Sequence, residues 1–250
     1  MRYFRNFPRV DYKFGDEFIN IGGGDAVYEI TQDISSYVDV IDNIKQTASF
    51  YSKYTILEND RADVVSEKIY GTPAYHWTFY MMNDNIRTYG WPLTMLELEK
   101  KVKRDFPHKY VETRGDMTGN HLVGQRTQGA QSGAIGTIEK RFLDLGIIII
   151  DSEKSFQKGE VITNAAPAGA STESLAVAAT GFEYNAPRYY TDGDGLRVDI
   201  DPAVGPGALL TEITNFDHYV KENDKLREIT VIRPDAITSV VGAYFQAMGN

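Results

Sequence analysis

Residues 59–73 read NDRADVVSEKIYGTP, and this stretch contains the clearest helix signals in the chain. Asp60 stands where a side chain can cap a helix over Arg61–Tyr70. Asp63 would lie in the first turn, where an acidic residue interacts favourably with the helix dipole. Gly71 can adopt the left-handed conformation that commonly ends a helix. We therefore predict a short helix that begins after Asp60 and ends before Gly71.

A second helix is predicted to begin at Pro73, because proline suits the first turn of a helix. Ala74, Trp77 and Met81 follow at positions i, i+3 and i+7, which predicts one buried helical face. Trp77 is accordingly expected in the core, together with Trp91 and Leu98.

The stretch that follows predicts a loop and then a third helix. Residues 83–90 are expected to form the loop, which Trp91-Pro92 closes. Thr94 and Glu97 form a capping box, in which each side chain can bond the backbone amide of the other residue. This helix should end before Phe106-Pro107, because a proline disfavours helical conformation in the residue before it.

The N-terminal segment is predicted to be extended. Phe18–Ile21 and Val27–Ile30 flank Gly22–Asp25, and this pattern favours a hairpin over a phosphate-binding loop. Residues 33–54 fit either a helical stripe or a strand, so both alternatives stay open.

From about residue 113 the composition and the hydrophobic pattern of the sequence change. Gly, Ala, Ser and Thr dominate, and β-branched runs replace helical stripes. Strands are predicted at residues 137–138, 143–150, 160–163 and 196–200. Residues 164–181 fit a loop, a strand or a short helix. We interpret residues 113–205 as a small antiparallel β module inserted into the chain.

The C-terminal segment becomes more polar again. We predict a helix over 216–226, a strand over 228–232 and a last helix that starts at Pro234-Asp235. The patterns together predict an α+β fold in four segments, which are an N-terminal arm and hairpin at 1–50, a helical unit at 51–112, the β-rich insertion at 113–205 and a C-terminal segment at 206–250 that completes the core.

The composition argues against several classes of protein. The 250 residues include 26 Lys and Arg and 35 Asp and Glu, which gives a net charge of −9. Such a chain has no general attraction for nucleic acid, and we find no Lys/Arg-rich run interleaved with aromatic residues. The chain has no cysteine, which excludes disulfides and thiolate metal sites and fits a reducing cytoplasm. Its longest purely aliphatic run, 147–150, is too short to cross a membrane, and the first residues lack the apolar stretch of a signal peptide.

The sequence offers no positive sign of an active site. None of the usual catalytic motifs includes any of the four histidines, His76, His108, His121 and His218. Asp192-Gly193-Asp194-Gly195 resembles the start of a calcium loop, but Leu196 occupies the fifth position, so we favour a hairpin turn. Paired carboxylates could still support glycoside hydrolysis, because their separation depends on the fold. We expect no catalytic residue, no metal and no cofactor.

Several separated pieces resemble one viral family. Residues 51–77, Asn83 and 91–93 are similar to the baseplate wedge protein of contractile-tailed bacteriophages, the small wedge subunit that contains a LysM-like domain. Residues 3–8 and 222–234 extend this resemblance, which covers about 1–107 and 212–241. The family's usual Arg-Pro-Asp appears here as Arg61-Ala62-Asp63. The residues that carry the family motifs are Tyr54, Asp60, Arg61, Asp63, Ser66, Tyr70, Gly71, Trp77, Asn83, Trp91, Pro92, Asn223 and Arg227.

The resemblance implies a structural component of a virion. It implies a LysM-like form for residues 54–93, with short strands at either end of a helix pair. It also implies six copies in each baseplate, where the protein binds other wedge subunits and helps to join neighbouring wedges around the tail hub. Tyr3, Phe4, Phe7 and Pro8 have little of their own chain to pack on, so we expect them to be interface anchors.

Two other functions remain open at this point. A LysM-type module could bind peptidoglycan, an alternative that Asn59-Asp60, Tyr70-Gly71 and Asn83 motivate. A tail-associated enzyme that cleaves the cell wall could use carboxylates of the β-rich insertion. The leading expectation is a protein made in the host cytoplasm that acts by contact, without binding nucleic acid or a membrane.

Overall fold

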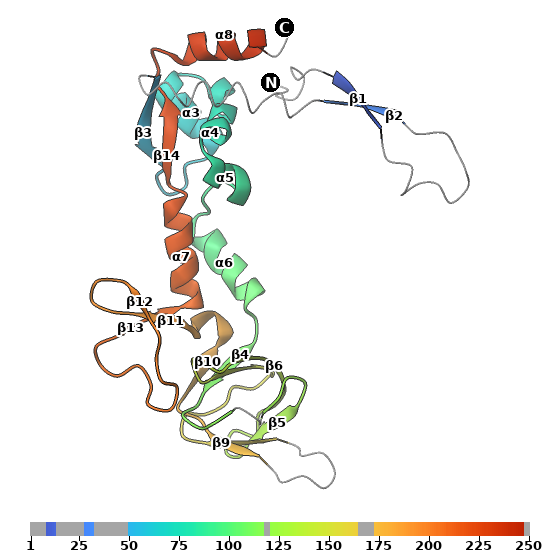
Figure 1. Cartoon of the computed structure of the whole chain (residues 1–250), viewed down its shortest axis with the longest axis vertical. Coiled ribbons are helices and arrows are strands. Elements are labelled where there is room, and N and C mark those ends of the chain that lie inside the picture. The colour runs from blue at the N-terminus through green and yellow to red at the C-terminus, as the bar shows by residue number, and fades with distance from the viewer. Residues whose placement is uncertain (1–8, 14–27, 33–49, 118–120, 165–172, 248–250) are drawn as a thin grey trace. The chain divides into compact units, whose positions relative to one another are not determined.

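The computed structural model describes residues 9–13, 28–32, 50–117, 121–164 and 173–247 (Figure 1). It is a mixed α/β protein, and every strand pairing in these ranges is antiparallel. The chain divides into two compact units. Unit 1 contains residues 1–92 and 224–250, and unit 2 contains residues 93–223, so unit 2 is inserted into the sequence of unit 1.

Unit 1 combines short strands with short helices. Its strands are β1 (Arg9–Lys13), β2 (Tyr28–Gln32), β3 (Tyr51–Thr55) and β14 (Glu228–Ile232). Its helices are α3 (Ala62–Tyr70), the 3₁₀ turn η3 (Pro73–Tyr75), α4 (Trp77–Met82), α5 (Asp84–Tyr89) and α8 (Ile237–Ala247). β3 pairs with β14, and β1 pairs with β2. The order β3, α3, α4–α5, β14 therefore places a helix pair between two strands that pair with each other.

Two apolar clusters form the core of unit 1. One brings the sheet together with α3, α4 and α5 and contains Ile56, Val65, Phe79, Ile86, Ile229 and Val231. The other joins α4 to α8 and contains Trp77, Met81, Met82, Ile232, Ala236, Ile237, Val240, Val241 and Tyr244. Both clusters include residues of the C-terminal segment 224–250. This segment therefore completes the core of unit 1.

Unit 2 is mostly β structure. Its larger sheet contains β4 (Lys109–Glu112), β5 (Arg126–Gly129), β6 (Ile135–Phe142), β7 (Ile147–Asp151), β8 (Val161–Asn164), β9 (Ser174–Ala176) and β10 (Ala179–Phe182). A smaller sheet contains β11 (Pro187–Thr191), β12 (Arg197–Val198) and β13 (Thr211–Thr214). The helices are α6 (Met95–Asp105), the 3₁₀ turn η4 (Glu183–Asn185) and α7 (Asn215–Lys225), whose last two residues belong to unit 1.

The larger sheet closes on itself. Its strand order is β10-β4-β7-β6-β5-β8-β9, so the two edge strands are consecutive in the chain. Between them, the amide of Val177 donates to Glu160 O at 2.9 Å, and the amide of Ala178 donates to Glu112 O at 2.7 Å. The extended run 174–182 therefore joins both ends of the sheet, which leaves a barrel with few unpaired edges.

The aliphatic run 147–150 is buried on both faces of this barrel. Ile148 and Ile150 belong to the cluster that includes Val111, Ile138 and Ile162, which fills the barrel. Ile147 and Ile149 belong to a different cluster, with Leu145, Ala186 and Tyr190 beside the smaller sheet. Because successive side chains of a strand point to opposite faces, a strand covered on both sides must be apolar throughout.

Many predicted elements are present. Gly71 has φ +71° and ends α3, Asp63 lies in the first turn, and the Thr94–Glu97 capping box forms as predicted. The third helix ends at Asp105, before Phe106-Pro107. The strand 228–232 and the helices near 216–226 and 237–247 are confirmed.

Other predictions need correction. Asp60 does not cap α3, since the N-cap is Arg61 and it has no side-chain cap bond. Pro73 begins a 3₁₀ turn, and the following α-helix begins only at Trp77. Most of the predicted loop 83–90 is helix α5, and of the strand predicted at 196–200 only Arg197–Val198 forms.

The strand at the other end of the helix pair also differs from expectation. The described residues 90–94 contain no strand, and the partner of β3 comes from residues 228–232. Likewise β2 pairs with β1, residues 9–13, and not with the strand predicted just before the turn at Gly22–Asp25. The proposed first strand, residues 18–21, and most of the open stretch 33–54 lie outside the described residues, although 51–55 is a strand.

The segment boundaries differ as well. β4 pairs with β7 and β10, and therefore belongs to the barrel. α6 also belongs to unit 2, where the ring of Phe106 at its end lies 5.6 Å from that of Tyr219 on α7. The unit therefore starts at Leu93 rather than 113 and runs to Asn223 rather than 205. Among the described residues, none of the helices is long and apolar enough to cross a membrane.

Candidate functional site

Asn83 covers the outer edge of β14. Its Oδ1 accepts from the amide of Thr230 at 2.7 Å, and its Nδ2 donates to Thr230 O at 2.8 Å. The Nδ2 also donates to Phe79 O at 2.8 Å, and the residue is 8% exposed. The amide group thus pairs with both polar backbone groups of Thr230, as a residue of a neighbouring strand would. This use of the side chain explains why it does not cap α5, although Asn83 occupies the N-cap position.

Tyr70 covers the next outward carbonyl of β14. Its hydroxyl donates to Ile232 O at 2.8 Å, and its ring stacks on Phe79 with centroids 6.0 Å apart. Burial raises the pKa of the Tyr70 hydroxyl to about 12, so the group remains a donor at neutral pH. Together with Asn83, it connects the helix pair to a strand that lies more than a hundred residues further along the chain.

Asp60 and Trp91 connect the start of α3 to the residues that follow α5. The indole Nε1 of Trp91 donates to Asp60 O at 2.7 Å. The Asp60 carboxylate, 11% exposed, accepts from Lys68 Nζ at 2.7 Å. Close by, the buried Ser66 donates its hydroxyl proton to Thr72 O at 2.7 Å, beyond Gly71. The polar groups of these residues are therefore used within unit 1.

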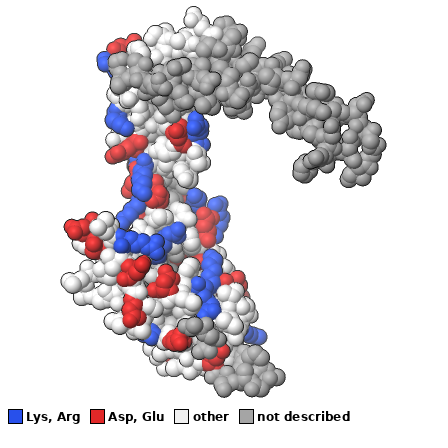
Figure 2. Space-filling view, viewed as in Figure 1, with Lys and Arg blue, Asp and Glu red and all other residues white. Residues whose placement is uncertain are grey.

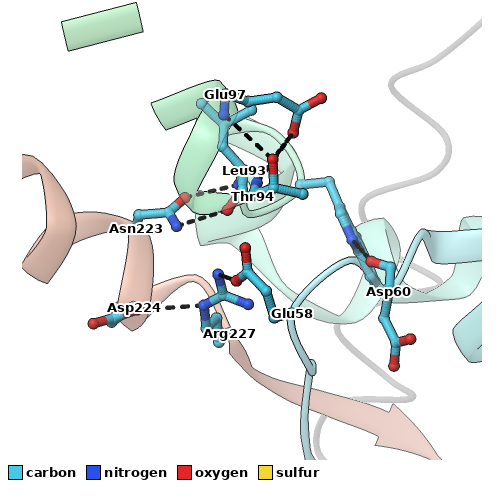
Figure 3. A network of polar contacts seen from close by, with 9 residues as sticks. Glu58, Asp60, Leu93, Thr94, Glu97, Asn223, Asp224 and Arg227 are labelled. Carbon is cyan, nitrogen blue, oxygen red and sulfur yellow. Dashed lines mark hydrogen bonds and ion pairs between the residues drawn. The ribbon is translucent and has the colours of Figure 1, made fainter. Parts of the chain in front are cut away.

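Arg227 ties the strand β14 to the loop after β3. Figure 3 shows its guanidinium between the carboxylates of Glu58 and Asp224, with Nη2 bonded to Glu58 and Nε 3.3 Å from Asp224. The side chain is only 16% exposed. Its backbone oxygen also accepts from the amide of Ile56 at 2.8 Å, which extends the pairing of β3 and β14 by one step.

Asn223 has a comparable role within unit 2. Its Oδ1 accepts from the amide of Leu93 at 2.8 Å, and its Nδ2 donates to Leu93 O at 2.9 Å (Figure 3). The neighbouring Thr94 begins α6, and its amide donates to Glu97 Oε2 at 3.1 Å. A buried asparagine thus fixes the start of α6 against α7, and the capping box satisfies the next free amide.

The remaining motif residues divide between core and surface. Trp77 and Pro92 are buried, and Tyr54 packs half-buried on the core beside Ile229. Leu98 is buried as predicted, whereas Trp91 is only half-buried. Arg61 and Asp63 form an exposed ion pair with 3.3 Å between Nε and Oδ1. The predicted interface residues Tyr3, Phe4, Phe7 and Pro8 lie outside the described residues.

A pocket of about 420 Å³ opens beside Trp91 on unit 1. It is lined by Arg61, Ala62, Asp63, His76, Tyr80 and Trp91. The rings of Tyr80 and Trp91 lie 6.0 Å apart, and His76 Nδ1 is 2.9 Å from Pro73 O. Two aromatic faces beside a charged pair could receive a sugar ring or a side chain of a partner protein.

Glu160 is a fully buried carboxylate of unit 2 that the sequence patterns did not indicate. It accepts from the amides of Gln131 at 3.0 Å and Ser132 at 2.9 Å, from the Ser132 hydroxyl at 2.9 Å and from the amide of Gln157 at 2.5 Å. Desolvation would raise the pKa of Glu160, but the bonds from Ser132, Gln157 and Gln131 outweigh it and lower that pKa. This carboxylate joins two turns of the barrel.

His121 is the histidine whose surroundings are most unusual. It is fully buried with φ +53°, and its Nδ1 lies 2.8 Å from Asn164 Oδ1. Its Nε2 is buried without a hydrogen-bond partner. Burial lowers the pKa of His121, and Arg141 lowers it further, while Asn164 and Glu173 act in the opposite direction. With Nδ1 engaged and Nε2 enclosed, the ring is poorly placed to act as a base on an external substrate.

The carboxylates Glu112 and Glu212 come closest to the paired acids considered for hydrolysis. Burial raises the pKa of Glu212, and the charge of Glu112 raises it further. Glu112, however, is buried in an ion pair with Arg114 at 2.5 Å. In the turn at 192–195, Asp192 Oδ1 accepts from the amides of Asp194 at 3.0 Å and Leu196 at 2.9 Å. Within the described ranges, no group of three or more His, Asp or Glu side chains could hold a metal ion.

The sequence motifs identified residues that hold each unit together, but not how they do so. Asn83 and Asn223 both pair with a backbone far away in the sequence, and a lone asparagine in a sequence gives no sign of such a partner. Glu160 and His121 had no local signal, because their partners come from other strands and turns. Comparison with models of known protein families gives no match, and no curated protein shows significant similarity to this chain.

Proposed function

We propose that this protein is a structural subunit of the baseplate wedge of a contractile phage tail. It would bind other wedge subunits and help to join neighbouring wedges into a ring around the tail hub. Its place would be the tail baseplate of the virion, with six copies per ring, after synthesis in the host cytoplasm. It would act through contact surfaces, without catalysis, nucleic acid or membrane.

The order of elements in unit 1 supports the LysM-like part of this proposal. A LysM-like form has short strands at either end of a helix pair. Strand β3, helices α3 and α4–α5, and strand β14 follow that order, and β3 pairs with β14 along five residue pairs. In this chain, residues 93–223 stand between the helix pair and the second strand. A LysM-like unit would thus carry a barrel as an insertion.

The use of the motif residues is the observation that carries the proposal. The polar groups of Tyr70, Asn83 and Trp91 bond backbone atoms of their own unit, and none of these bonds reaches a group poised for chemistry. Such residues build a small rigid body. Exposed apolar side chains on this body, namely Leu57, Val64 and Tyr89, are then available for protein contact.

Removal of residues 1–10 tests the proposal. This truncation deletes Tyr3, Phe4, Phe7 and Pro8 and stops before most of β1. The expected result is a folded monomer that no longer joins a wedge complex, because aromatic anchor residues contribute strongly to such contacts. Size-exclusion chromatography after co-expression with candidate wedge subunits measures this, and removal of residues 248–250 serves as the control. Equal incorporation of both truncated chains would contradict the role of the arm.

A second function is favoured by the pocket beside Trp91. A peptidoglycan-binding module would stack sugar rings on Trp91 and Tyr80 and bond them through Arg61 and Asp63. A pull-down with chitooligosaccharides tests it, and the Arg61→Ala variant removes one charged group that lines the pocket. Binding that this variant weakens would support the glycan module over the wedge subunit.

The absence of catalysis is tested separately. A zymogram on cell-wall material measures whether the chain cleaves peptidoglycan. We expect no clearing. Clearing that is lost in Glu112→Gln would instead support an enzyme that uses the carboxylates of unit 2.

A further inference from the structure

Unit 2 gathers cations and aromatic rings from separate parts of the sequence. We name this surface the basic–aromatic face, and it consists of Lys101, Lys103, Lys109, Lys140 and Arg188 with the rings of Phe106, Phe182, Tyr184 and Tyr219. These residues come from α6 and the loop after it, from β4, β6, β10, η4 and β11, and from α7. Only the fold brings them together, because no continuous stretch of the sequence contains them all.

The ring of Tyr219 is the centre of one half of this face. Lys101 Nζ and Arg188 Cζ each lie 5.8 Å from its centroid. The ring of Phe106 lies 5.6 Å from that of Tyr219, and Lys140 Nζ is 5.9 Å from the centroid of Phe106. These distances are within the range of cation–π attraction, so the rings hold the cations at the surface in defined positions.

The rings of Phe182 and Tyr184 form the other half. They stack with centroids 5.3 Å apart. Lys103 Nζ lies 5.4 Å from the centroid of Tyr184, and Lys109 Nζ lies 3.6 Å from that of Phe182. Lys140 connects the two halves, since its Nζ also lies 2.9 Å from Oε1 of Glu183, which stands between the two rings in the sequence.

The cations of this face outnumber their acidic partners. Lys103 pairs with Glu99 at 2.6 Å, and Lys140 pairs with the buried Glu183 at 2.9 Å. Lys101, Lys109 and Arg188 have no carboxylate within 4.0 Å in the part of the chain that the structure describes. Figure 2 shows Lys and Arg side chains (blue) interspersed with Asp and Glu side chains (red) on the visible face of unit 2. Among the described residues, the five cations that define the face thus have only two carboxylate partners, Glu99 and Glu183, on a chain whose net charge is −9.

We infer that the basic–aromatic face binds an acidic segment of a partner protein. Lys101 and Arg188 are exposed, lie against one ring and can each meet a carboxylate of the partner, whereas Lys109 is buried and is engaged by the ring of Phe182. A protein segment can place single carboxylates at these positions. The net charge of −9 disfavours a long polyanion such as a nucleic acid, whereas a short acidic segment would contact the face alone. The inference describes the chemistry of a wedge partner and rests on the proposed function only for the identity of that partner.

The test measures binding of a short poly-L-glutamate peptide to the full chain by fluorescence anisotropy at low salt. An oligothymidylate of equal charge is the competing probe. The double variant Lys101→Glu with Arg188→Glu should bind poly-L-glutamate at least about tenfold more weakly, because two attractive charges become repulsive. The pair Lys53→Glu with Lys158→Glu makes the same change in net charge at exposed lysines outside the face, and should bind like the unchanged chain.

Each outcome decides the inference. Tighter binding of oligothymidylate than of poly-L-glutamate, equal weakening in both double variants, or no binding of poly-L-glutamate would overturn it. Circular dichroism shows that each variant is folded, and Lys101→Arg with Arg188→Lys, which keeps the charges, should retain binding. Co-expression with wedge subunits separates the two proposals. A chain that binds poly-L-glutamate as expected but joins no wedge would refute the proposed function alone, and the reverse result would refute the face alone.

Discussion

Unit 1 and unit 2 solve the same problem, the exposed edges of a small antiparallel sheet, in different ways. In unit 2 the run 174–182 bonds both ends of the larger sheet, so backbone groups satisfy one another. In unit 1 the sheet of β3 and β14 has only two strands, and the side chains of Asn83 and Tyr70 bond the outer edge of β14. Unit 1 therefore depends on a few polar side chains, whereas the closure of unit 2 is spread over many backbone bonds.

The largest effect expected from this difference is that of Asn83→Ala. The change removes three hydrogen bonds and leaves the amide and carbonyl of Thr230 without their side-chain partner, while the carbonyl of Phe79 keeps its bond from the backbone amide of residue 83. We expect unit 1 to lose about 3 kcal/mol of stability, since each buried group left unpaired costs on the order of 1 kcal/mol or more. Urea denaturation followed by tryptophan fluorescence measures it, because Trp77 and Trp91 both belong to unit 1.

The matched control is Lys53→Ala. Lys53 bonds the same residue, Thr230, but through an exposed contact of 3.3 Å between Nζ and Oγ1. Its removal should cost no more than about 0.5 kcal/mol, because exposed polar contacts contribute little. Hydrogen exchange should show faster exchange in β14 of Asn83→Ala with the barrel strands unchanged. A uniform increase over both units, or equal effects of the two variants, would contradict the contrast between the units.

Glu160→Gln is the corresponding change in unit 2, and its effect should be smaller. Glutamine keeps one acceptor oxygen but places an NH₂ group against amides that also donate. We expect a loss of about 2 kcal/mol, the size of a hydrogen bond to a charged group. Glu139→Gln, an exposed glutamate on β6, is the control and should change stability by less than about 0.5 kcal/mol.

The same variant makes a prediction about pH. The pKa of Glu160 is lower in the folded chain than in the unfolded chain, so its contribution is complete above the usual glutamate pKa. The contribution is lost as the pH falls below that value and through the folded pKa. The urea midpoint of the unchanged chain should therefore fall on acidification more steeply than that of Glu160→Gln. Parallel curves for the two proteins would rule out a lowered pKa at this position.

Local signals in the sequence were sufficient for the helices and strands that depend on neighbouring residues. Gly71, the pair Thr94 and Glu97, and the Phe106-Pro107 dipeptide all act within a few residues of themselves, and the structure agrees with each of them. The predicted capping by Asp60 is wrong for the opposite reason. Its carboxylate bonds Lys68, and its backbone oxygen bonds Trp91 some thirty residues away. Distant partners of this kind override a local preference.

The topology and the candidate surfaces could not be read from the sequence in the same way. Nothing in residues 228–232 alone identifies residues 51–55 as their partner strand, and the 93–223 insertion separates the two. The basic–aromatic face is the clearest example. The sequence shows a cluster of cations in α6, but the rings of Phe182, Tyr184 and Tyr219 that hold those cations come from other elements. Only a long-range fold can supply this information.

The smallest expected effect concerns His121, and it also separates the two units. Burial lowers the pKa of its imidazole in the folded chain below the unfolded value of 6.5, since the charged form loses hydration and faces Arg141, while Asn164 and Glu173 only partly compensate. The unfolded chain thus binds the proton more readily, so unit 2 should lose stability as the pH falls below about 6.5.

The change His121→Asn should remove this dependence of stability on pH, because asparagine tolerates the positive φ of this position and does not titrate. Hydrogen exchange of the barrel strands at two pH values reports it, while β14, a strand without a histidine that lies outside unit 2, should show no such slope near 6.5. If the slope persists in His121→Asn, the proton enters elsewhere, and the enclosed imidazole is then only a packing residue of the barrel.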